Sequence, residues 1–273
     1  MSSHRFGVVG NPFRTIWDNR GLIKLFVFRD FQGRFQGSFL GVVWYLLTPL
    51  LLLLLYSFVF STVFRVRWGE GENSSSEFVL ALYLGLLQFN FFSECISKGP
   101  SLIIAQSNFV KKIVFPLEIL PCITVFSTLL YGALGFIVWV LVHLIFLGAL
   151  PLTALLYPLI LIPLLLFTLG VAWFLASLGV FIRDLSHIVG FICSALMFLS
   201  PLFFPVASFP ERFRFLLYFN PLTPAIEQSR DVLLWGNLPD LRVTFFSWAV
   251  STLIAALGFV WFVRTKKGFF DVI

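Results

Sequence analysis

A run of 24 residues without a charged side chain, from Gly41 to Phe64, most constrains what this chain can fold into. A helix rises 1.5 Å per residue, so such a run spans roughly 30 Å of bilayer hydrocarbon. Hydrophobic residues make up 59% of the chain and charged residues only 12%, whereas soluble domains carry about 25% charged residues. The sequence therefore predicts an integral membrane protein.

The segment before this run mixes aromatic with charged side chains, namely Lys24, Phe26, Phe28, Arg29, Asp30, Phe31, Arg34 and Phe35. Such a mixture suits a helix that lies in the headgroup layer and then turns into the first span. We expect an amphipathic interfacial helix within residues 1–38. The alternative is that Arg29 and Arg34 serve only to set the membrane topology.

Five further apolar runs follow, so we expect an all-α membrane protein with spans at about 41–64, 78–96, 117–147, 152–182, 188–204 and 243–263. Together they form one transmembrane domain, residues 39–273. Only a few residues separate the third and fourth spans, which predicts a tight helical hairpin. Six prolines between Pro201 and Pro239 predict broken helical pieces after the fifth span.

The distribution of basic residues predicts the orientation. Thirteen Lys and Arg residues fall on the side that holds both termini, against six on the other side. Because basic residues are enriched in short cytoplasmic loops, we expect both termini in the cytoplasm. The net charge of +6 is explained by this orientation and by contact with anionic lipid, and it does not indicate nucleic acid.

The segment between the second and third spans is too polar to cross a membrane. Within it, Ser101 to Val114 predicts a short amphipathic helix, since Pro100 can open a helix and Pro116 can stop one.

Several kinds of chemistry have no support in the sequence. No Gly-Lys dipeptide occurs, which excludes the phosphate-binding loop of many ATPases. The three histidines are scattered and the three cysteines lack CxxC spacing, so we expect no metal site. No carboxylate lies in the middle of an expected span, which argues against an ion-driven carrier. No set of nucleophile, base and acid is visible, so we do not expect an enzyme.

Aromatic residues are abundant, with 36 Phe, 8 Trp and 6 Tyr. Most should face lipid or form interfacial belts. Rings inside a pore would instead offer flat, weakly polar faces to sugar rings and let a long hydroxylated chain slide. The candidates for such a channel lining are Tyr45, Tyr56, Phe60, Phe198 and Phe203.

Four blocks in this order resemble the membrane subunit of ABC-2 type exporters, and most closely the exporters of O-antigen, capsule and teichoic acid. The blocks are RDF and RF before LGVVWYLLTPLLLLLLYSFVF, then NFVKKIVFPLEILP, then FIRDLSHI with SPLFFP, and finally FNPLTPAIEQSRDVLL. They extend from about Arg29 to Leu234, so the resemblance covers most of the chain.

The resemblance implies that two copies of the chain form a twelve-helix channel, with a separate cytoplasmic ATPase subunit bound to each copy. ATP and magnesium would be bound by that partner, and this chain would hold no cofactor. The missing phosphate-binding loop fits this division of labour.

The resemblance also assigns roles to residues. Ser101–Val114 would be a coupling helix seated on the ATPase, with coupling residues Asn108, Phe109, Lys111, Lys112, Phe115 and Pro116. A second contact would use Arg183 and Asp184, and the interfacial helix with Arg29, Asp30 and Arg34 would lie beside the ATPase. Pro201–Trp235 would be a broken hairpin over the channel exit, marked by Asn220, Pro221, Arg230 and Asp231. Alternatively, Lys111 and Lys112 supply only topology charge.

The function expected from these observations is a permease of the bacterial cytoplasmic membrane that exports a lipid-linked polysaccharide with a partner ATPase. An ABC-2 exporter of a small lipid or drug is the nearest alternative. A membrane scaffold or lipid-modifying enzyme without a transport role belongs to a different class.

Overall fold

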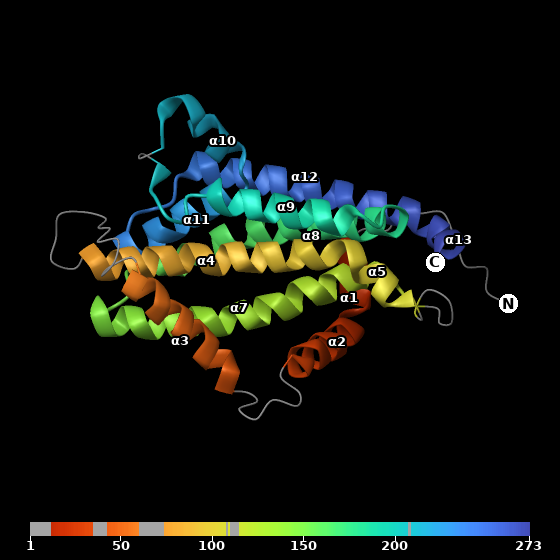
Figure 1. The fold of residues 1–273 in the computed structure, drawn as a ribbon, viewed down its shortest axis with the longest axis horizontal. Helices are drawn as coiled ribbons and strands as arrows, with labels where there is room; N and C mark the ends of the chain where they lie inside the picture. Colours follow the sequence, from red (N-terminus) through yellow and green to blue (C-terminus); the bar gives the residue numbers. More distant parts are fainter. Residues whose placement is uncertain (1–11, 35–42, 60–73, 108, 110–114, 207–208) are drawn as a thin grey trace.

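The computed structural model describes residues 12–34, 43–59, 74–107, 109, 115–206 and 209–273, which form a bundle of helices (Figure 1). The described elements are α1 (Pro12–Asp18), α2 (Arg20–Gly33), α3 (Trp44–Ser57), α4 (Ser74–Lys98), η3 (Gly99–Ser101), α5 (Leu102–Ala105), α7 (Ile119–Phe146), η4 (Leu152–Leu156), α8 (Tyr157–Phe181), α9 (Leu185–Phe198), η6 (Glu211–Phe213), α10 (Arg214–Phe219), α11 (Leu222–Arg230), η7 (Asp231–Trp235), α12 (Leu241–Thr265), η8 (Lys266–Gly268) and α13 (Phe269–Val272). This arrangement confirms the all-α fold class.

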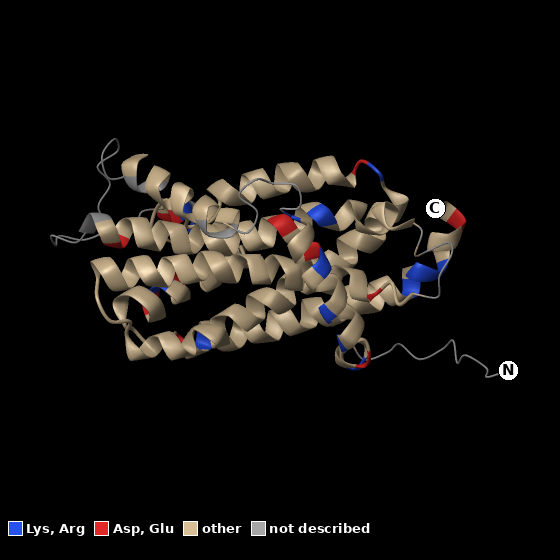
Figure 2. Cartoon of the chain, turned by 90° about the horizontal axis from the view of Figure 1, so that it is seen from below, with Lys and Arg blue, Asp and Glu red and all other residues tan. Residues whose placement is uncertain are grey.

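Four stretches of the described residues are long and apolar enough to cross a membrane, namely Ser76–Ala105, Ile119–Phe146, Leu152–Phe181 and Leu241–Val272. They correspond to the second, third, fourth and sixth expected spans. Long parts of these helices carry no charged residue (Figure 2). The first and fifth spans stay predictions, because α3 and α9 each have 14 residues and residues 60–73 lie outside the described part.

The two ends of the bundle differ. At the end where the C-terminus, α5 and α13 lie, here called the terminal end, α4 and α12 finish and α7 begins (Figure 1). At the opposite end, here called the hairpin end, α7 turns into η4 and α8, and α11 leads into α12. The turn after α7 contains Gly148 with φ 85°, a left-handed conformation that glycine adopts without strain. This is the tight hairpin that the sequence predicts.

Two local deviations from expectation have physical causes. The helix expected over Ser101–Val114 is not continuous: α5 ends at Ala105, and Gln106 has non-helical angles, φ −109° and ψ 32°. The fifth apolar segment, expected to reach Phe204, is helical only to Phe198. Pro201 follows shortly after, and the residue before a proline avoids the α-helical conformation.

The closest helix pair is α8 with α12. Buried Ser251, Ala255 and Gly258 form a strip of small side chains on α12, and buried Gly170 lies opposite them on α8. A Cβ atom at Gly258 would collide with the backbone of Gly170. Small residues let two membrane helices approach until their backbones touch, and dispersion forces then stabilise the pair.

Replacing Gly258 by Ala should destabilise the protein by about 1–3 kcal/mol, because the new methyl group must push α12 away from α8. Gly132→Ala in α7 is the matched control, since a Cβ there meets nothing within 4 Å. Thermal unfolding of both variants in the same detergent tests this. Equal unfolding temperatures would show that the α8–α12 contact is not close-packed.

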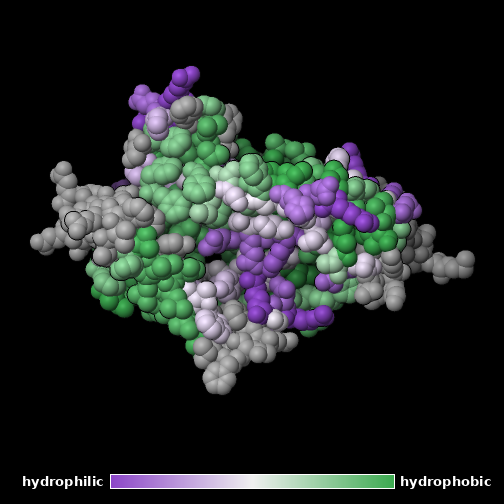
Figure 3. All heavy atoms as spheres, viewed as in Figure 1, coloured by the Kyte–Doolittle hydropathy of each residue, from purple (hydrophilic) through white to green (hydrophobic). Residues whose placement is uncertain are grey.

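The surface of the bundle is largely apolar, as expected for a protein surrounded by lipid. Green, hydrophobic residues cover much of the face seen in Figure 3, and a hydrophilic strip crosses it between α3 and α2. Large exposed side chains include Leu141, Ile145, Phe191 and Phe245. A soluble monomer rarely exposes so large an apolar surface.

Candidate functional site

An aromatic junction at the terminal end joins the interfacial helix to the expected coupling segment. Phe109 and Phe115 stack with ring centroids 4.6 Å apart. Phe26 of α2 meets both of them edge-on, at 5.8 Å and 5.7 Å, and the Arg29 guanidinium lies 5.6 Å from the Phe26 ring centroid. Such aromatic pairs add about 0.5–1.5 kcal/mol each beyond their buried area. Phe109 within the expected coupling segment and Phe115 just after it are thus both in contact with one side chain of α2.

The start of the coupling segment is anchored on α8. A Cβ at Gly179 would collide with the backbone of Pro100, and a Cβ at Gly99 would lie 3.1 Å from the Leu175 Cβ. The backbones of η3 and α8 are therefore in direct contact. A displacement of the segment would move the end of α8 with it.

A polar cluster fixes the end of α2 to the bundle. Arg34 forms an ion pair with Glu94 of α4 and donates a hydrogen bond of 3.2 Å to the Thr128 hydroxyl of α7. The same guanidinium lies 5.0 Å from the Tyr131 ring centroid. Lys98 contacts the Glu94 carboxylate from the other side at 2.7 Å. Arg34 therefore does more than set topology.

A second ion pair brings the C-terminal segment to the start of α7. Lys266 Nζ lies 2.9 Å from Glu118 Oε1, and the Trp173 indole donates to the Glu118 carbonyl at 2.8 Å. Phe269 of α13 is fully buried against Phe181 and Phe262. Glu118, close after Pro116, is therefore held by α8 and η8 as well.

The expected second contact, Arg183 and Asp184, forms the exposed turn between α8 and α9. The Asp184 carbonyl accepts the backbone N–H of His187 at 3.0 Å. Both charged side chains are accessible at the terminal end. Asn108, Lys111 and Lys112 lie outside the described residues, so their coupling role stays a prediction. Asp30 is exposed on α2.

The hairpin end is organised around Arg230, whose side chain is fully buried. It donates to the carbonyls of Ala81 at 3.0 Å, Pro201 at 2.7 Å and Leu202 at 3.1 Å, and to Glu227 Oε1 at 2.8 Å. One guanidinium therefore ties α11, α4 and the turn after α9 together. We call these groups the Arg230 cluster.

Burial has opposite effects on the two charged members of this cluster. It lowers the pKa of Arg230 to about 10, so the guanidinium stays charged at neutral pH. It raises the pKa of the Glu227 carboxyl, while the charge and hydrogen bond of Arg230 act against that rise.

Neighbouring residues of the expected outer hairpin support the same turn. Buried Asn220 donates to the Leu199 carbonyl at 2.9 Å and the Ser200 hydroxyl at 2.8 Å, and Pro221 precedes the first residue of α11. The Asp231 carboxylate accepts from the Asn237 amide at 3.3 Å. A residue not singled out from the sequence, Gln88 of α4, donates to the Ser229 hydroxyl at 2.6 Å.

The candidate channel residues are not brought together within the described part of the chain. Phe198 is 66% exposed at the end of α9, whereas Phe203 is half-buried against the core. The side chains of Tyr45 and Tyr56 and the whole of Phe60 lie outside the described residues. The channel lining therefore stays a prediction.

Most of the residues described at both ends of the bundle belong to a stretch of the chain that is similar to known proteins. A sequence model of the ABC-2 type transporter family matches residues 21–234. The chain belongs to the ABC-2 type transporter family. The matched range begins in α2 and ends in η7. It therefore includes the aromatic junction, the Arg34 ion pair and the Arg230 cluster of this ABC-2 protein.

Three curated proteins are similar to this ABC-2 chain over nearly its whole length, and each is named O-antigen export system permease protein RfbA. The protein from Myxococcus xanthus is 28% identical over 244 residues, covering 88% of this chain and 91% of the relative. Two proteins from Klebsiella pneumoniae are 26% and 25% identical over 259 residues, covering 92% of this chain and 95% of each relative.

Several residues at these sites could not be singled out from the sequence, because their partners are distant in the chain. Glu94 and Lys98 lie near the end of the second expected span. Lys98 contacts Glu94 from the next turn of the same helix, but the other cation on this carboxylate, Arg34, is 60 residues away. Glu118 and Lys266 are separated by 148 residues. Only the fold brings such pairs together.

Removing the negative charge of Glu94 should loosen α2. Glu94→Gln leaves the half-buried Arg34 without its anionic partner, and we expect a loss of about 1–3 kcal/mol in unfolding free energy, between the values typical of exposed and buried pairs. Asp30→Asn removes an exposed carboxylate from α2 and should change stability by less than about 0.5 kcal/mol. Thermal unfolding compares the two, and equal losses would contradict a structural role for the ion pair.

Arg230→Met should be far more damaging. It leaves Glu227 without its cation and three carbonyls without their donor, and breaking a buried pair from one side costs about 3–5 kcal/mol. Arg183→Met removes an exposed guanidinium and is the matched control. The yield and unfolding temperature of the purified variants measure the difference. If the two variants are equally stable, the Arg230 cluster does not hold the hairpin end.

Proposed function

We propose that this ABC-2 protein is the permease of a bacterial exporter of lipid-linked polysaccharide, driven by a separate ATPase subunit. One observation carries the proposal: three proteins named as O-antigen export permeases are similar to at least 88% of this chain. The chain itself contains no phosphate-binding loop, so the energy must come from another polypeptide.

We further propose a complex of two copies of this chain and two ATPase subunits in the cytoplasmic membrane, with both termini in the cytoplasm. The excess of basic residues on the terminal side supports this orientation. ATP and magnesium are bound by the ATPase, and this chain takes no part in the hydrolysis.

The terminal end offers a mechanical route from the ATPase to the spans. In the proposal, the ATPase contacts the segment between Ser101 and Pro116, the Arg183–Asp184 turn and α2. Closure of the ATPase dimer on ATP moves that segment. The Phe109–Phe115 stack transfers the movement to Phe26, and the Pro100–Gly179 contact transfers it to α8. Arg34 then links α2 to α4 and α7.

At the opposite end, the Arg230 cluster is suited to hold the hairpin as one rigid piece. Its guanidinium donates to backbone carbonyls of separate segments and to the Glu227 carboxylate. A rigid hairpin over the exit keeps the channel closed until the spans move. In this proposal, the aromatic residues Tyr45, Tyr56, Phe60, Phe198 and Phe203 line the path of the sugar chain.

Complementation of a deletion strain tests the function and the coupling route together. The deletion should abolish surface polysaccharide and leave the undecorated lipid intact, and wild-type protein should restore it. Phe26→Ala should restore about a tenth or less of the polysaccharide, because aromatic contacts of the order of 1–3 kcal/mol are lost at the junction. Phe28→Ala, an exposed residue of the same helix, should restore it fully.

Two outcomes would overturn these proposals separately. Normal polysaccharide with sensitivity to a drug in the deletion strain would indicate an exporter of small molecules. Full restoration by Phe26→Ala would leave the export function standing but remove the coupling role from the aromatic junction. Membrane fractions of each variant must contain equal amounts of the protein.

A further inference from the structure

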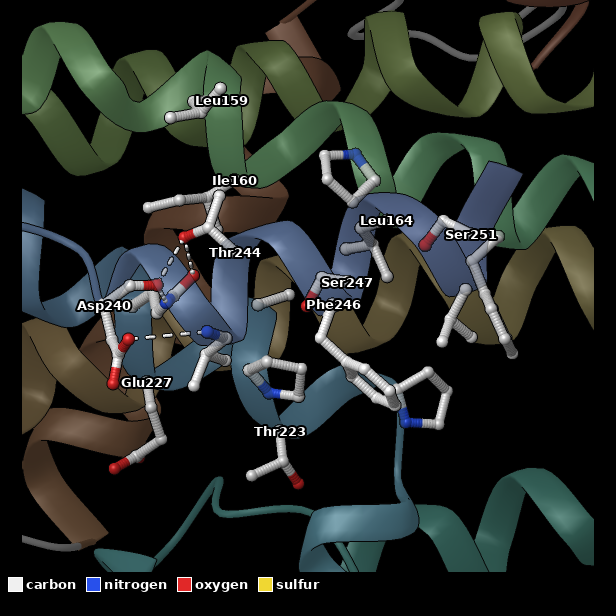
Figure 4. A pocket seen from close by; sticks show the side chains of 18 of the residues that line it. Leu159, Ile160, Leu164, Thr223, Glu227, Asp240, Thr244, Phe246, Ser247 and Ser251 are labelled. Atoms are coloured by element: carbon white, nitrogen blue, oxygen red, sulfur yellow. Dashed lines mark hydrogen bonds between the residues drawn. The ribbon is translucent and has the colours of Figure 1, made fainter. Parts of the chain in front are cut away.

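A cavity of about 680 Å³ opens at the hairpin end between α8, α11 and α12 (Figure 4). It lies apart from the aromatic junction and from the candidate channel residues, none of which lines it. It shares Glu227 with the Arg230 cluster, but the proposed path of the sugar chain does not pass through it. The cavity lies between two membrane-crossing helices and a broken hairpin, so a molecule from the membrane can occupy it.

The lining changes from polar to apolar along the helices. Glu227, Asp231, Asp240 and Arg242 line it where α11 leads into α12, and Ile160, Leu164, Phe246 and Val250 line it along α8 and α12. Phe246 is 68% exposed, so the apolar flank reaches the lipid-facing surface. The cavity is therefore polar at one end and apolar at the other, as a phospholipid is from its headgroup to its acyl chains.

The polar part favours a headgroup with a positive charge. Three carboxylates and one guanidinium line it. The Asp240 carboxylate accepts the backbone N–H groups of Arg242 and Val243 at the start of α12. The Arg242 side chain is exposed and can meet an anionic group. An ammonium beside the carboxylates and a phosphate beside Arg242 would match these charges.

We propose that the cavity binds one membrane phospholipid with an aminoethyl phosphate headgroup, that is, phosphatidylethanolamine. The ammonium lies near Glu227, Asp231 and Asp240, the phosphate near Arg242, and an acyl chain along the flank of Leu164 and Phe246. A segment of sugar chain would find too few hydrogen-bonding groups on that flank. The bound lipid fills the space beside α11 and thereby supports the helix that carries Arg230. This proposal does not depend on the identity of the exported molecule.

Native mass spectrometry of the full-length, delipidated protein tests the proposal, with phosphatidylethanolamine or phosphatidylglycerol of identical acyl chains added at equal concentrations. The wild type should retain one phosphatidylethanolamine per chain in preference to phosphatidylglycerol. Ser247→Trp places an indole in the cavity and should abolish the preference. Thr252→Trp lies on the exposed side of α12, outside the cavity, and should preserve it.

A second variant keeps the test informative if Ser247→Trp fails to fold. Asp231→Asn should reduce the preference for phosphatidylethanolamine about fivefold, the effect of one charge near a membrane surface. Equal retention of the two lipids by the wild type would mean surface lipid only and would overturn the proposal. So would a preference that survives in Ser247→Trp, or retention of a glycan in place of phospholipid.

Discussion

The structure depends on the requirement that polar groups placed in an apolar bundle find their partners inside the protein. Water cannot satisfy them in the hydrocarbon layer, and each unpaired group costs several kcal/mol. The fully buried Arg230 meets this requirement by donating to the Pro201 and Leu202 carbonyls of the turn after α9 and to the Ala81 carbonyl of α4. The same side chain that is hardest to bury thus fixes the geometry of the hairpin end.

At the terminal end the requirement is met differently, and the difference has a functional meaning. Arg34 and Glu94 are only half-buried and Lys98 is exposed, and the contacts around Phe26 are aromatic. Such contacts can slide or reorient at small cost, whereas the buried Arg230 cluster cannot. In the mechanism that we propose, one end moves with the ATPase and the other end resists until the spans have moved. The distribution of buried charge along the bundle provides this asymmetry.

The sequence predicts the parts of this fold that depend on local composition. Charge-free runs predict the long helices, and the crowding of prolines predicts the broken segment around Pro201. The sequence does not predict helix boundaries that depend on the backbone angles of one residue, as at Gln106, where α5 ends earlier than expected. The sequence also does not predict contacts between residues that are distant in the chain. Glu118 could be recognised as charged, but nothing near it in the sequence indicates Lys266, and the lining of the α8–α11–α12 cavity combines residues from Leu159 to Ser251.

Reconstitution into liposomes measures the central claim most directly, namely that this ABC-2 chain moves polysaccharide only with energy from a partner. Purified permease would be incorporated with or without the ATPase, and the passage of a lipid-linked glycan to the opposite face would be followed after addition of ATP. The account predicts transfer only when permease, ATPase and hydrolysable ATP are all present. Transfer by the permease alone, at the same rate with and without ATP, would contradict it.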